Sequence, residues 1–265
     1  AAKRFNIGAV CREGTVRATQ GTVELRFARL DSNRPLPQLM GKLKCTALSA
    51  DAMKHCIVQR PFSNNTEFAF SVFLPNAGEY ILQVYASDPQ RGGDSYVMIL
   101  HQTKGTQVHF QLRFPHSGFF KLQLYALPVR DGSNSLPKVY NYLIEASAYH
   151  RIHGQVMPFP KQLDHWHRGC YLKTPTEGIL GLGDNGRLDS KPPSSLPFDV
   201  RVPNAIAIAV VVGDRRTNLD CKGDRWMSKV HMQKHWGTKQ KLTVYAKYAA
   251  EDTECSRLLE YALAM

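Results

Sequence analysis

Histidine is the residue type in this sequence with the clearest potential for metal chemistry. Seven of the ten histidines fall between His101 and His167, and they include two close pairs, His150-x-x-His153 and His165-Trp166-His167. Imidazoles at such spacing can converge on a metal ion. Neither pair lies on an evident helix with a carboxylate, as in His-Glu-x-x-His. We therefore expect exposed linker and strand histidines and predict no metal site.

The six cysteines do not form a recognisable reactive or structural set. They are spread over the chain and no two have Cys-x-x-Cys spacing, which argues against a small disulfide scaffold and a structural zinc site: Cys11, Cys45, Cys56, Cys170, Cys221 and Cys255. A nucleophilic cysteine requires a helix N-terminus or a basic partner that lowers its pKa. None of the six has such a predicted setting, so we predict no catalytic residue.

The glycine-rich segment GLGDNG, from Gly181 to Gly186, could be taken for a phosphate-binding loop. Such a loop needs a strand before it and a helix after it, so that backbone amides and the helix dipole meet the phosphate. The residues that follow, RLDSKPPSSLP, contain two prolines and cannot form that helix. We predict a hairpin or loop here, and no cofactor.

A sequence repeat indicates the elements that position these residues. The segment FSVFLPNAGEY, Phe70 to Tyr80, has a counterpart in FDVRVPNAIAI, which begins at Phe198. Three further blocks recur in the same order: VHFQLRF with VHMQKHW, KLQLYA with KLTVYA, and YNYLIEA with LLEYALA. Such conserved order indicates two copies of one unit. We interpret each Pro-Asn-Ala as a corner between two strands.

Apolar and polar residues alternate through these blocks, as in Val108 to Phe114. A period of two is typical of half-buried strands, and no helical pattern of ten residues is evident. Turn signals recur about every ten residues, which favours antiparallel sandwiches. We predict an all-β chain in which Tyr125, Tyr142, Tyr245 and Tyr261 serve packing rather than chemistry. Trp236 is predicted to be a core residue, whereas Trp226 remains open between packing and ligand stacking.

The predicted domain organisation is a first sandwich over residues 1–149, a linker over 150–163 and a second sandwich over 164–265. The linker assignment depends on two prolines in HGQVMPFPKQL. Residues 1–17 have no clear assignment beyond a strand that could be added to the first sandwich.

Composition limits the classes of partner. The chain has 265 residues, is 43% hydrophobic and has a net charge of +12. Its basic residues occur singly and in pairs, which favours a solvated basic surface over a nucleic-acid patch. The longest apolar run, Ala205 to Val212, is far shorter than a membrane span, so no transmembrane segment is expected. The first residue is alanine, and we expect a processed product or a fragment.

Several of these blocks resemble the region that follows the transglutaminase-like domain in the kyphoscoliosis peptidase and hillarin family. The matching stretches are FSVFLPNAGEYILQVYA (70–86), LKTPTEGIL (172–180), LPFDVRVPNA (196–205), LTVYA (242–246) and LLEY (258–261). The resemblance implies two tandem immunoglobulin-like antiparallel β-sandwiches. The family's catalytic Cys-His-Asp segment is not found in this sequence, so no enzymatic activity is carried over.

We therefore predict a non-catalytic structural or interaction protein, cytoplasmic and associated with the cytoskeleton, whose basic surface meets an acidic partner. One alternative is a secreted matrix or biomineral scaffold that binds an anionic polymer or mineral and assembles through strand edges into homo-oligomers. Another is an accessory region of an enzyme whose catalytic domain lies upstream. The segments DPQRGGD (88–94) and DRRTNLDCKGD (214–224) are predicted as loops that could serve as binding tips.

Overall fold

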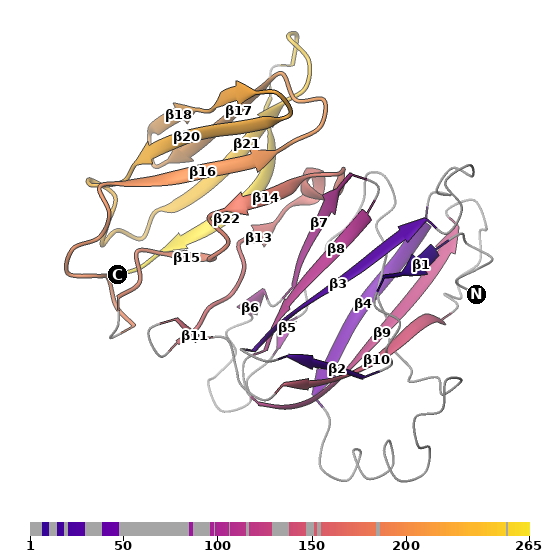
Figure 1. Ribbon diagram of the computed structural model, residues 1–265. Helices are drawn as coiled ribbons and strands as arrows, with labels where there is room; N and C mark the ends of the chain where they lie inside the picture. The colour runs from indigo at the N-terminus through magenta and orange to yellow at the C-terminus, as the bar shows by residue number, and fades with distance from the viewer. Residues whose placement is uncertain are drawn as a thin grey trace. The chain divides into compact units, whose positions relative to one another are not determined.

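The structure is a computed structural model, and it describes residues 7–10, 15–18, 21–29, 39–47, 85–86, 96–97, 99–105, 107–114, 117–128, 138–146, 151–152, 155–183, 186–252 and 254–265 (Figure 1). The chain divides into two compact units. The first comprises Ala1–Ala77, Leu82–His101 and Gly105–His150, and the second comprises Gly78–Ile81, Gln102–Lys104 and Arg151–Met265. The first copy of the repeat, 70–80, and the segment 88–94 lie outside the described residues.

Two four-stranded sheets form the first unit. One has the order β1 (Ile7–Ala9), β3 (Thr22–Arg29), β8 (Gln107–Arg113) and β7 (Ile99–Lys104, of which Gln102–Lys104 group with the second unit). The other has the order β2 (Thr15–Ala18), β10 (Lys138–Ala146), β9 (Gly118–Pro128) and β4 (Leu39–Ala47). The N-terminal segment thus adds a strand to each sheet, since β1 pairs with β3 and β2 lies parallel to β10.

The predicted alternation places the core of the first unit between its sheets. Leu25 and Phe27 on β3, with Phe110 on β8, are buried. The ring of Phe27 lies 5.9 Å from that of Phe110 and 6.3 Å from that of Tyr142 on the opposite sheet. Tyr142 is buried as well, which supports its interpretation as a packing residue.

The second unit also has two sheets. One has the order β13 (Lys161–Gln162), β22 (Ser256–Leu263), β21 (Lys241–Lys247), β17 (Ala207–Val212) and β18 (Arg215–Asn218), with β15 (Ile179–Leu180) parallel to β22. The other has the order β14 (Tyr171–Thr174), β16 (Ser195–Arg201), β20 (Arg225–His231) and β19 (Asp220–Lys222). The segment predicted as a linker contributes β13 to this unit.

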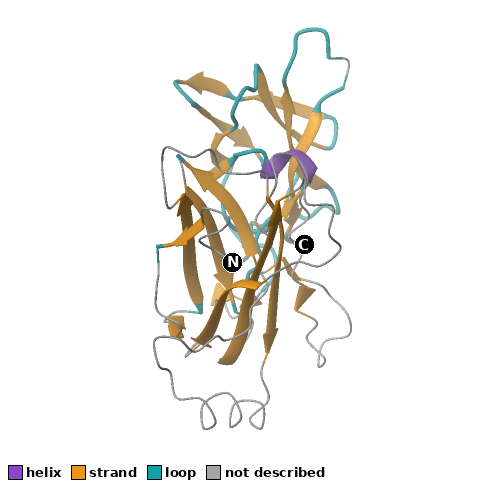
Figure 2. Cartoon of the chain, turned by 90° about the vertical axis from the view of Figure 1, so that its right-hand side faces the viewer, coloured by secondary structure: helices purple, strands orange, loops and turns teal. Residues whose placement is uncertain are grey.

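The remaining elements of the described residues are short. Two small antiparallel pairs join β5 (Tyr85–Ala86) to β6 (Tyr96–Val97) and β11 (Arg151–Ile152) to β12 (Gln155–Val156). The 3-10 helix η3 (Asp164–His167) is drawn in purple among the strands of Figure 2. None of the helices in the described ranges is long and apolar enough to cross a membrane.

Both units have the strand order of an immunoglobulin fold. The β1-β3-β8-β7 sheet of the first unit and the β14-β16-β20-β19 sheet of the second have the order A-B-E-D. The other sheet of each unit contains strands C, F and G, with an additional strand parallel to G. The rings of Phe198 on β16 and Tyr261 on β22 meet across the sheets of the second unit at 5.8 Å. The predicted fold class, two tandem immunoglobulin-like β-sandwiches, is confirmed.

The second Pro-Asn-Ala is a strand-to-strand corner, as predicted. It connects β16 in one sheet to β17 in the other, and the Ala205 amide donates to the Val202 carbonyl at 3.5 Å. Asn204 has a φ of 60°, which together with the preceding Pro203 is the pattern of a type II turn. The equivalent connection of the first unit runs from β3 to β4, and the first Pro-Asn-Ala lies outside the described residues.

Two of the three tryptophans of the second unit were considered as core or binding residues, and the structure contradicts the prediction for one of them. Trp236 is not a core residue: it is half-buried in the turn after β20, where its Nε1 donates to the Pro193 carbonyl at 3.0 Å. Trp226 is 8% exposed and lies on the inner face of β20, so it serves packing. The prediction for Trp236 was wrong because β20 ends at His231, and the strand alternation used to align Trp236 with Phe114 does not extend to residue 236.

Candidate interaction surface

The outer face of the β14-β16-β20-β19 sheet carries a group of charged side chains. On β16 and β20, Phe198, Val200, Trp226 and Val230 point inward and their neighbours point outward. The strand register places four cationic side chains on the outer side, and Lys173 joins them there through its contact with the outward Asp199; we call these five residues the basic face: Lys173, Arg201, Lys222, Arg225 and Lys229.

A buried carboxylate organises the centre of the basic face. The Asp199 side chain is 9% exposed, although it lies on the outer side of β16. Arg225 Nε donates to Asp199 Oδ1 at 2.9 Å and its terminal Nη2 donates to Oδ2, so the guanidinium binds the carboxylate through two bonds. Lys173 Nζ lies 3.6 Å from Oδ2. A buried carboxylate needs such partners because its desolvation is costly.

The cations around this cluster differ in how far they are neutralised. Arg201 pairs with Asp224 at 2.6 Å. Lys222 and Lys229 are exposed, and within the part of the chain that the structure describes neither forms an ion pair with a carboxylate. The basic face therefore presents two lysines whose charge is available to a partner.

The segment 214–224 was predicted to be a loop, and this prediction was wrong. The segment contains two edge strands, β18 and β19. Two-residue turns, Gly213-Asp214 and Gly223-Asp224, join β18 to β17 and β19 to β20. The glycines have φ values of 58° and 67° at the first turn position, which suits the hairpin turn that matches strand twist. Between β18 and β19, Leu219 is buried and its amide donates to the Ile208 carbonyl at 2.9 Å. The segment thus passes from one sheet to the other.

The residues singled out for metal or phosphate chemistry do not assemble into a site in the described residues. His150 and His153 lie outside them, and the His165 ring on η3 lies 5.6 Å from the Tyr248 ring. No group of three potential metal ligands occurs within the described ranges. On either side of the glycine-rich segment, a Leu182–Leu188 bridge and a hydrogen bond from the Gly183 amide to the Arg187 carbonyl give the antiparallel pairing that the predicted hairpin requires.

Cys170, Cys221 and Cys255 are free thiols. Cys170 is buried at 1% exposure, and this burial raises the pKa of its thiol to about 12. Such a thiol remains protonated and unreactive at neutral pH. Cys221, in contrast, is exposed on β19.

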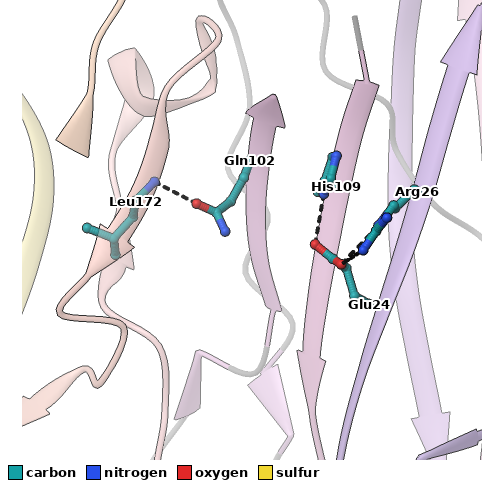
Figure 3. A network of polar contacts seen from close by, with 5 residues as sticks. All are labelled: Glu24, Arg26, Gln102, His109 and Leu172. Atoms are coloured by element: carbon teal, nitrogen blue, oxygen red, sulfur yellow. Dashed lines mark hydrogen bonds and ion pairs between the residues drawn. The ribbon is translucent and has the colours of Figure 1, made fainter. Parts of the chain in front are cut away.

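A second charged group lies on the outer side of the first unit's β3-β8 pair (Figure 3). His109 Nδ1 lies 2.8 Å from Glu24 Oε1, and Arg26 Nη2 donates to Glu24 Oε2 at 2.7 Å. His109 is 5% exposed. Burial raises the pKa of Glu24, but the hydrogen bonds and charges of His109 and Arg26 outweigh it, so the pKa is held below its usual value.

The lowered pKa of Glu24 has a consequence for stability. Because the carboxylate is favoured in the folded state, its stabilisation is fully present above the unfolded-state pKa of about 4.5 and is lost as pH falls through the folded pKa. We expect Glu24→Gln to lower the unfolding free energy of the first unit by about 1–2 kcal/mol at pH 7.

Urea denaturation at pH 7 and pH 3 checks this expectation. The difference in unfolding free energy between Glu24→Gln and the original protein should be smaller at pH 3 than at pH 7. Glu145→Gln is the matched control, since its ion pair with Arg17 is at the surface and contributes about 0.5 kcal/mol. An equal loss from both substitutions would contradict the assigned role of Glu24.

Figure 3 also shows a hydrogen bond between a backbone amide and a side chain of the second unit. The Leu172 amide of β14 donates to Gln102 Oε1 at 2.6 Å, and the Thr103 amide donates to the Cys170 carbonyl at 2.9 Å. The outer edge of β14 is therefore already occupied at the Leu172 amide, and so is the carbonyl of Cys170 just before the strand.

Comparison with known proteins gives one family assignment. Residues 90–160 match the family described as KY-like, immunoglobulin-like domain. No curated protein matches the sequence. Similar solved structures include a marsupial T cell receptor, with 9% sequence identity and a TM-score of 0.24, where the match covers 96% of this chain and 97% of that chain. Another is a chimeric titin Z1Z2 tandem, with 9% sequence identity and a TM-score of 0.21, where the match covers 98% of this chain and 100% of that chain.

The clusters that give the surface its charge were not predicted from the sequence. Asp199 stands between Phe198 and Val200 as one of many polar residues in alternating strands, and its partners are 26 positions away in each direction. The alternation shows that Asp199 points outward, but only the strand register brings Arg225 and Lys173 to it.

Proposed function

We propose that this chain, which carries an immunoglobulin-like domain of the kyphoscoliosis peptidase type, acts as an interaction module that docks onto an acidic protein surface of the cytoskeleton. At the coarse level the domain family is that of a non-catalytic structural or interaction module. The observation that carries the finer proposal is the basic face, where Lys222 and Lys229 are exposed without carboxylate partners in the described residues.

The architecture of the basic face suits recognition rather than catalysis. Asp199 is enclosed by Arg225 and Lys173, so it is neutralised within the protein and does not repel an incoming carboxylate. A sheet face with outward lysines can approach an extended acidic surface without rearrangement. Long-range attraction of this kind speeds encounter and is screened by salt.

The cysteine positions support a location inside cells. Antibody domains carry a disulfide between strands B and F. In the second unit the corresponding strands, β16 and β21, contain no cysteine, and Phe198 and Val244 are buried in them instead. The core of this unit is thus held by apolar packing, which suits a reducing compartment.

Co-sedimentation with actin filaments, with polyglutamate as a simple acidic probe, tests the proposal. We expect binding in 50 mM salt that is at least tenfold weaker in 500 mM salt. Lys229→Glu should weaken binding about fivefold, by loss of one attractive charge and gain of a repulsive one.

Lys161→Glu is the matched control, because it makes the same charge change at an exposed position on the other sheet of the same unit. An equal loss of binding from both substitutions would show that only net charge matters. Binding that is unchanged in half-molar salt would remove the electrostatic basis of the proposal.

A further inference from the structure

The strand β19 is an open sheet edge in the second unit. It is the last strand in its sheet, and all three of its residues, Asp220, Cys221 and Lys222, are exposed. Among the described residues, β19 pairs with β20 alone. An open edge offers backbone donors and acceptors to another strand.

The hydrogen-bonding direction along β19 follows from its hairpin. Lys222 lies opposite Arg225 across a two-residue turn, so this pair closes the hairpin and directs its backbone groups toward β20. Bonded and non-bonded pairs alternate along an antiparallel ladder. The amide and carbonyl of Cys221, the next residue, therefore point away from β20 and toward the open edge.

Other edges of the same unit are less suited to pairing. The β14 edge already accepts and donates hydrogen bonds with Gln102 and Thr103. On β18, the exposed residues Arg215 and Arg216 are cationic, and the strand has no carboxylate that could face them in a second copy. Charged edges of this kind prevent self-pairing.

The charges on β19 are instead complementary to themselves. When two antiparallel copies of Asp220-Cys221-Lys222 meet with Cys221 at the centre, Asp220 of each chain lies opposite Lys222 of the other. We propose that β19 is a homotypic interface, through which a second copy of this chain adds its own β19 in antiparallel orientation about a two-fold axis at Cys221.

The geometry of antiparallel sheets favours this register over its neighbours. The two Cys221 residues would form the bonded pair and exchange both backbone hydrogen bonds. The two Asp220–Lys222 pairs would then be non-bonded pairs, whose side chains lie closest, with Cα atoms about 4.5 Å apart. A shift of register by one residue on either side would lose both opposite-charge pairs. The two-fold symmetry also closes the assembly at a dimer.

Sedimentation velocity of the full chain in 50 mM salt, over a range of protein concentrations, tests the interface with charge-reversal variants. Asp220→Lys and Lys222→Asp should each weaken dimerisation at least tenfold, because every cross-strand pair becomes repulsive. The double variant should dimerise like the original protein. A mixture of the two single variants should form a heterodimer, since the lysine pair of one meets the aspartate pair of the other.

Oxidation with diamide gives an independent readout of the register. The two Cys221 Cα atoms would lie about 5.5 Å apart, within the range that a disulfide spans. A cross-linked dimer should form with the original protein, fail to form with Cys221→Ser and decline in each single charge variant.

A protein that stays monomeric and uncross-linked at all concentrations would overturn the proposal. Dimerisation that is unchanged by either single charge reversal would overturn it as well, because another surface would then be responsible. Since all three residues are exposed, circular dichroism should show no change of fold in any variant. The inference shares Lys222 of the basic face with the docking proposal, but the two tests use different residues, because the docking test changes Lys229 and leaves β19 unaltered.

Discussion

Replacing Gly178 with alanine is expected to destabilise the second unit by about 3 kcal/mol, the upper range for an overpacked site. The added Cβ would lie 2.5 Å from the Phe159 carbonyl carbon and 3.0 Å from the Pro158 oxygen. Both are backbone atoms, so no side-chain rotation relieves the clash. The Gly178 amide also donates to the Pro158 carbonyl at 2.8 Å, and its carbonyl accepts from the Ala262 amide at 2.9 Å. Moving the two segments apart would therefore strain both hydrogen bonds.

Thermal and urea unfolding of the second unit measure the effect. Gly223→Ala is the matched control: its added Cβ meets nothing within 4 Å, and its φ of 67° costs an alanine about 1 kcal/mol. The comparison separates a steric cost from the general cost of replacing glycine. If Gly178→Ala lowered the unfolding free energy no more than Gly223→Ala does, the close packing of Gly178 against the Phe159 backbone would be contradicted.

The sheet architecture could be predicted from the sequence because its signals are local. Alternation of Leu25 and Phe27 with Glu24 and Arg26 depends only on neighbouring residues, and it appears in the structure as the two faces of β3. The corner at Pro203 and Asn204 is likewise local, since proline restricts φ and asparagine tolerates a positive φ. These signals define strands and turns without saying which strands pair.

The interaction surface depended on pairing, and for that reason it was not predicted. The register between β16 and β20 brings Arg225 to Asp199, and the register between β19 and β20 directs the Cys221 backbone outward. Pro75-Asn76-Ala77 matches the second corner in residue type, and it lies outside the described residues.

The pair His165 and His167 shows how a candidate for chemistry became a packing element. Trp166, between them, is 0% exposed and lies on η3, which is set against β22. The Trp166 amide donates to the Leu163 carbonyl at 2.8 Å, and the Leu163 amide donates to the Leu258 carbonyl of β22 at 2.9 Å. The segment that contains the two histidines therefore places the Trp166 side chain in the core of the second sandwich.

Trp166→Ala is accordingly expected to destabilise the second unit by about 3–5 kcal/mol, the range for a fully buried aromatic side chain. The matched control is Trp236→Ala, in the half-buried turn, where the loss should be smaller by about 2 kcal/mol because less apolar surface leaves the core. Urea unfolding followed by circular dichroism compares the two without relying on tryptophan fluorescence, and Trp166→Phe should recover part of the loss by filling most of the cavity. Equal losses at Trp166 and Trp236 would contradict the burial of Trp166, and η3 would then be a surface turn whose histidines remain available for chemistry.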